Sequence, residues 1–111
     1  YGINKNGTFG SITCRLYHNT SNTLVGSTLI ATLFLSSTQL TGSFERLFEI
    51  SGGLLKCRIG SSTNSFSDKQ SSAAAQLSIT FNPAIDNYFF TTVQLGNASD
   101  SVTRTQLLIS K

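Results

Sequence analysis

The chain has 111 residues, 39% hydrophobic and only 12% charged, with a formal net charge of +3. This length fits a single domain, and a chain that is neither strongly charged nor poor in apolar residues is not of the disordered type. The longest apolar stretch is far shorter than the roughly 20 residues of a membrane span, and the basic residues are scattered rather than gathered in a stripe. We therefore expect one ordered domain over residues 1–111, without membrane insertion and without a nucleic-acid partner.

The hydrophobic period is two almost throughout, which indicates β-strands. In the segment 12–17, for example, Ile12, Cys14 and Leu16 alternate with polar or aromatic residues. The same alternation predicts seven strands in chain order, at 12–17, 29–35, 44–50, 55–59, 77–81, 88–95 and 102–110.

Turn signals rich in Gly, Asn and Ser separate these segments, among them Asn6-Gly7, Gly52-Gly53 and Asn82-Pro83. Short strands at this spacing each bury one face and need a second sheet to cover it. The expected fold class is all-β: an antiparallel two-sheet sandwich of about eight strands.

Two of the predicted strands, 29–35 and 88–95, are apolar on both faces. One sheet face of a sandwich lies in the core, so the second apolar face needs another cover. An aromatic ring at a strand end could simply lie on the surface, whereas a larger outer patch is typical of contacts between identical copies. The residues expected at such an oligomer interface are Ile30, Phe34, Tyr88 and Phe90.

No arrangement of residues predicts an enzyme. His18, the single histidine, lies where a strand enters a polar turn, and we expect it to be solvated. Asp68, Asp86 and Asp100 lie in predicted loops without the spacing of a calcium-binding loop, so solvated turn positions are expected for them. One histidine and two cysteines supply no zinc-ligand set. No catalytic residue, metal or cofactor is therefore expected.

Cys14 and Cys57 both fall in the inward register of their strands. They could pair as a disulfide, or remain thiols that pack as small hydrophobic side chains. The redox compartment decides between these alternatives.

The longest irregular stretch, residues 61–72, is a candidate ligand-binding loop. It contains Asn64, Phe66 and Asp68, and an aromatic ring beside directional polar groups is a composition suited to sugar binding. The alternative is an ordinary loop with Phe66 turned into the core.

Residues 79–103 resemble a pattern in the structural proteins of tailed bacteriophages. In that pattern a turn leads into an alternating strand that ends in Val-Gln-hydrophobic, here Val93-Gln94-Leu95. A hairpin follows, here 97–101, and then a final strand that ends near a lysine, here 107–111. The sequence departs from the commonest form at 82–84, where threonines are usual, and at Leu95, where tryptophan is frequent.

The resemblance implies a jelly-roll of the tumour-necrosis-factor or C1q type at the C-terminal tip of a trimeric fibre, spike or capsid appendage. It therefore implies a virion location, a homotrimer, other virion proteins as partners, and attachment to a host-surface glycan or protein. The matching residues form strands and turns, so they support the fold rather than a particular ligand. Two alternatives remain: a capsid decoration or assembly domain without receptor binding, and a secreted monomeric carbohydrate-binding module.

Overall fold

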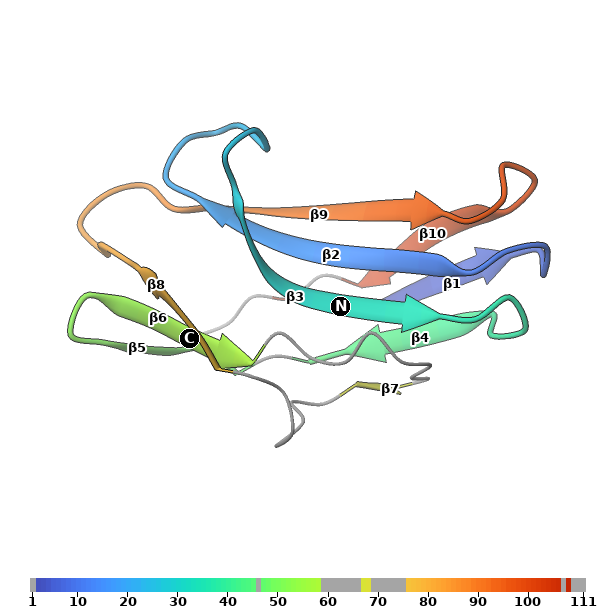
Figure 1. Ribbon diagram of the computed structural model, residues 1–111, viewed down its shortest axis with the longest axis horizontal. Helices are drawn as coiled ribbons and strands as arrows, with labels where there is room; N and C mark the ends of the chain where they lie inside the picture. Colours follow the sequence, from blue (N-terminus) through green and yellow to red (C-terminus); the bar gives the residue numbers. More distant parts are fainter. Residues whose placement is uncertain (1, 46, 59–66, 69–75, 107, 109–111) are drawn as a thin grey trace.

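The computed structural model describes residues 2–45, 47–58, 67–68, 76–106 and 108. These residues form β-strands joined by turns and loops, and no helix occurs among them (Figure 1). The strands in chain order are β1 (Gly2–Asn6), β2 (Ile12–Asn19), β3 (Thr28–Leu35), β4 (Thr41–Phe44), β5 (Glu49–Ser51), β6 (Leu54–Arg58), β7 (Ser67–Asp68), β8 (Gln76–Thr80), β9 (Tyr88–Leu95) and β10 (Ser101–Gln106).

The strands form three small sheets, with the orders β10-β1-β4-β7, β3-β2-β9 and β5-β6-β8. All pairings are antiparallel except the short parallel pair of β4 and β7. The all-β prediction is confirmed. The prediction of two sheets is not confirmed, because the strands that would form the second sheet are divided in two: β1 and β4 belong to one sheet, and β5 and β6 belong to another.

One core joins the three sheets. Alternate residues of β2 face it, including Ile12, Cys14 and Leu16, since side chains in a strand point to opposite faces. The remaining buried apolar members are Ile3, Ile30, Ala31, Leu33, Leu35, Leu55, Cys57 and Phe81.

Strand β3 contacts both of the other sheets. At one end Leu35 lies against Gly42 of β4, where a Cβ on the glycine would stand 2.7 Å from a Leu35 methyl carbon. At the other end the Cys57 thiol of β6 donates a hydrogen bond to the Ile30 carbonyl, at 3.5 Å. The β3-β2-β9 sheet is therefore the layer against which both other sheets pack.

A β-bulge corrects one predicted interface residue. The register of β3 shifts so that Leu16 faces Ala31 while the next residue, Tyr17, faces Leu29. The extra residue, Ile30, turns inward beside Ala31, and both are fully buried. Regular alternation would place Ile30 on the outer face, so the prediction that it lies in an oligomer interface is wrong.

Two further strand predictions change. The segment 44–50 was expected as one strand, but β4 ends at Phe44 and β5 begins at Glu49 in a different sheet. Strand β1 was not predicted, because its second inward position beside Ile3 holds a charged residue, Lys5, and the apolar alternation is lost.

Candidate functional site

The loop proposed for ligand binding lies almost wholly outside the described residues. Asn64 and Phe66 are among those not described. The backbone of Asp68 belongs to β7 and pairs with Phe44 of β4. The role of this loop therefore stays a prediction.

The outer face of the β3-β2-β9 sheet carries the other three residues predicted at an oligomer interface. Phe34, Tyr88 and Phe90 are all half-buried within the single chain. Phe90 lies directly opposite Tyr17 of β2, and Phe34 lies opposite Thr13. The outer face is thus aromatic, but none of these rings is strongly exposed, and their part in an interface stays a prediction.

Two further exposed apolar side chains lie on the inner face of β9. Val93 and Leu95 point to the core side of the sheet, yet they are 39% and 38% exposed. They line an open groove together with Thr91, and with Val102 and Arg104 of β10. The molecule is therefore open along the groove between β9 and β10.

Both strands at this opening are edge strands within the described part of the chain. β9 pairs only with β2, and β10 pairs only with β1. The sequence of β9, Tyr-Phe-Phe-Thr-Thr-Val-Gln-Leu, holds no charge and no proline over eight residues. It lacks the devices that normally protect an exposed edge, which are charges, prolines, bulges and short length.

A pair of buried charges fixes the loops at one end of the molecule, where the β1–β2, β3–β4 and β9–β10 connections gather (right side of Figure 1). The carboxylate of Asp100, 4% exposed, accepts hydrogen bonds from the backbone N–H groups of Phe9 at 3.2 Å and Gly10 at 2.7 Å. The Lys5 ammonium, also 4% exposed, donates to the carbonyls of Gly10, Ser36 and Ser37 at 2.8, 3.2 and 2.6 Å.

These contacts satisfy charges that would otherwise be costly to bury. The expectation that Asp100 is a solvated turn residue is therefore wrong. Its position before a strand resembled a surface turn, and the backbone groups that hold it come from a loop about ninety residues earlier.

His18 is also buried, at 5% exposure, so the expectation of a solvated histidine is wrong. Its ring centroid lies 5.5 Å from that of Phe81 and 5.4 Å from that of Phe89. The Asn87 amide nitrogen donates to the carbonyls of Asn82 and Ile85, so the Asn87 oxygen is the acceptor, and His18 Nε2 donates to it at 2.8 Å. This histidine therefore anchors the β8–β9 loop through Asn87.

Cys14 and Cys57 are buried thiols, and the structure contains no disulfide between them. They pack in the core as small side chains, one from β2 and the other from β6.

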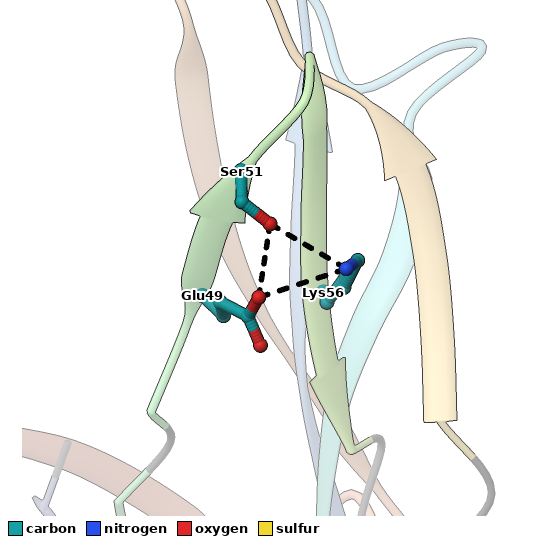
Figure 2. A network of polar contacts seen from close by, with 3 residues as sticks. All are labelled: Glu49, Ser51 and Lys56. Carbon is teal, nitrogen blue, oxygen red and sulfur yellow. Dashed lines mark hydrogen bonds and ion pairs between the residues drawn. The ribbon is translucent and has the colours of Figure 1, made fainter.

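An exposed charge cluster joins β5 and β6 (Figure 2). The Ser51 hydroxyl donates to Glu49 Oε1 at 2.9 Å, and the Lys56 ammonium lies 3.6 Å from the same oxygen. The Ser51 hydrogen bond and, next, the positive charge of Lys56 lower the pKa of Glu49 below its usual 4.5. These solvated partners fit a surface ion pair at a strand edge rather than a catalytic acid.

Within the described residues, no group of three or more His, Cys, Asp or Glu side chains could hold a metal ion. Over the same part of the chain, no helix is long and apolar enough to cross a membrane. No known protein family, curated protein or solved structure matches this chain. The open groove lined by β9 and β10 is the feature on which a functional proposal can be built.

Proposed function

We propose that this chain is a non-enzymatic assembly domain of a bacteriophage virion appendage, which forms a homotrimer and presents its loops to a host-surface glycan or protein. The virion part of the proposal rests on the sequence resemblance of residues 79–103 to tailed-phage structural proteins. The self-assembly part rests on one structural observation, the unprotected apolar opening along β9.

Exposed edge strands without charge pair with other chains unless they are covered. Val93 and Leu95 extend the apolar surface from the strand edge into the groove, and Val102 continues it on β10. Covering this side with another copy would remove both the edge and the groove from water. Among the described residues that line the groove, Arg104 is the only charged one.

A cyclic trimer requires two different surfaces on each copy, because the contact is head-to-tail. The open side is the first surface. The aromatic outer face of the β3-β2-β9 sheet, with Phe34, Tyr88 and Phe90, is the second surface in this proposal. Its rings are already half-buried in one chain, so they form a firm surface for a partner edge.

The jelly-roll topology belongs to the same proposal. Its support is the pair of connections that cross between sheets at one end: β1 leads to β2 and β9 leads to β10, while β1 pairs with β10 and β2 with β9. In this interpretation the β10-β1-β4-β7 and β5-β6-β8 sheets together form the second layer of a sandwich.

The assembly proposal is tested with a charged substitution at the opening and a matched one elsewhere. Val93→Lys adds a positive charge near Arg104 in the groove, and Ser78→Lys adds the same charge at an exposed site on β8, an edge strand of the β5-β6-β8 sheet. We expect Val93→Lys to reduce the solution mass to that of one chain and Ser78→Lys to leave the oligomer intact. Equal masses for the two variants would contradict the assignment of this surface.

Attachment is tested separately, with a glycan panel and host cells. The proposal expects weak binding that Asn64→Ala or Phe66→Ala abolishes without changing the oligomer. A decoration domain would instead bind a virion protein tightly and ignore host cells. A secreted carbohydrate-binding module would bind sugars as a monomer with an oxidised Cys14–Cys57 pair.

A further inference from the structure

The end of the molecule that holds Asp100 contains a turn in which Gly7 cannot readily be replaced by a residue with a side chain. Gly7 has a φ of +103°, a conformation that residues with a side chain rarely adopt. A Cβ added at Gly7 would also collide with Asp100 Oδ1. The loop clamp made by Asp100 thus requires glycine at position 7.

The residue before this glycine is Asn6, the last residue of β1, with an exposed side chain. Asn6-Gly7 is the only Asn-Gly pair in the sequence. A glycine after asparagine leaves the backbone nitrogen unshielded, because there is no Cβ beside it, and that nitrogen can reach the asparagine side chain. Because the Asp100 clamp requires glycine at position 7, no side chain at that position can shield the backbone nitrogen from the asparagine side chain.

We propose that Asn6 is a site of spontaneous deamidation in the folded protein. The Gly7 backbone nitrogen attacks Asn6 Cγ, a C–N bond forms, and the side-chain amide leaves as ammonia with the proton lost by the Gly7 nitrogen. Water then opens the resulting succinimide at one of its two carbonyls. Opening at one carbonyl gives aspartate, and opening at the other gives isoaspartate, in which the main chain runs through Cβ.

Either product acts on the adjacent clamp. Aspartate adds a negative charge one residue before Gly7, the residue against which the Asp100 carboxylate lies. Isoaspartate also lengthens the main chain by one methylene, three residues before Phe9 and four before Gly10, whose N–H groups bind Asp100. Modification at Asn6 is therefore expected to loosen the β1–β2 loop while leaving the β5-β6-β8 sheet unchanged.

The test incubates the folded protein in mildly alkaline buffer and follows each asparagine by peptide mass mapping and enzymatic isoaspartate methylation. We expect Asn6 to convert before any other asparagine, and hydrogen exchange at Phe9 and Gly10 to accelerate as it does. Asn6→Gln is the matched control and should show neither change. Asn97, also exposed but followed by alanine, is an internal comparison.

Two results would overturn the proposal. If Asn6 keeps its amide in the folded protein but converts in the urea-unfolded chain, the fold protects it. If isoaspartate forms at Asn6 while exchange at Phe9 and Gly10 stays unchanged, the modification does not act on the Asp100 clamp.

Discussion

Two buried charged side chains hold the backbone of Gly10. The Lys5 ammonium donates a hydrogen bond to the Gly10 carbonyl, and the Asp100 carboxylate accepts one from the Gly10 N–H. Hydrogen bonds to charged groups are stronger than neutral ones, and a buried backbone donor left without a partner costs free energy. We expect Asp100→Ala to lower the free energy of unfolding by about 2–4 kcal/mol. Urea denaturation measures this loss.

The control for that substitution is Asp86→Ala, because Asp86 is an exposed loop residue that accepts a long hydrogen bond, at 3.4 Å, from the Tyr88 hydroxyl. Surface changes of this kind stay within about 0.5 kcal/mol. Equal losses for the two variants would show that Asp100 does not clamp the loop.

The exposed cluster on β5 and β6 gives a pH prediction. The pKa of Glu49 is lowered by the Ser51 hydrogen bond and by Lys56, so these interactions favour the charged carboxylate. Their contribution to folding is present above the ordinary carboxyl pKa and is lost as the pH falls through the lowered value. An NMR titration of the Glu49 carboxyl should give a midpoint below 4.5, and Ser51→Ala should raise it. An unchanged midpoint in Ser51→Ala would contradict the leading role of that hydrogen bond.

At the scale of elements, the contact between β3 and β4 depends on a missing side chain. A Cβ at Gly42 would lie 2.7 to 3.2 Å from three side-chain carbons of Leu35, which is fully buried, so the Leu35 side chain would have to shift within the core. Overfilled cores lose stability. Gly42→Ala should therefore cost about 1–3 kcal/mol in denaturant unfolding. The control is Ser43→Ala, at the exposed residue that follows Gly42 in β4. Gly26→Ala would not serve as a control, because Gly26 has a positive φ that alanine rarely adopts.

Strands such as β2 and β6 were predictable because apolar residues recur at every second position and form one apolar face. The bulge at Ile30 could not be predicted from the sequence. Ile30 lies within a run of apolar residues, so an extra residue does not change the pattern, and only the pairing with β2 reveals the shift. The buried state of Lys5, His18 and Asp100 was equally hidden. Their partners are backbone groups, an amide and rings brought from distant segments, and single residues carry no signal of them.

At the scale of the whole molecule, the sequence predicts an apolar patch on the outer face of the β3-β2-β9 sheet, and the structure adds an exposed apolar surface on the inner side of β9. The outer rings of Phe34 and Phe90 are half-buried, whereas Val93 and Leu95 on the inner side are open. The inner side is open because β10 does not close over β9, and alternation along β9 cannot tell which of its two faces is covered. The proposed self-association therefore uses two surfaces, this opening and the aromatic outer face of the sheet.

The most direct test of self-assembly is the solution mass of the purified chain, measured by light scattering over a wide range of concentrations. The proposal predicts a stable mass near three chains, with β9 protected from hydrogen exchange along its outer edge. A single-chain mass at the highest concentration, with that edge exchanging freely, would contradict it.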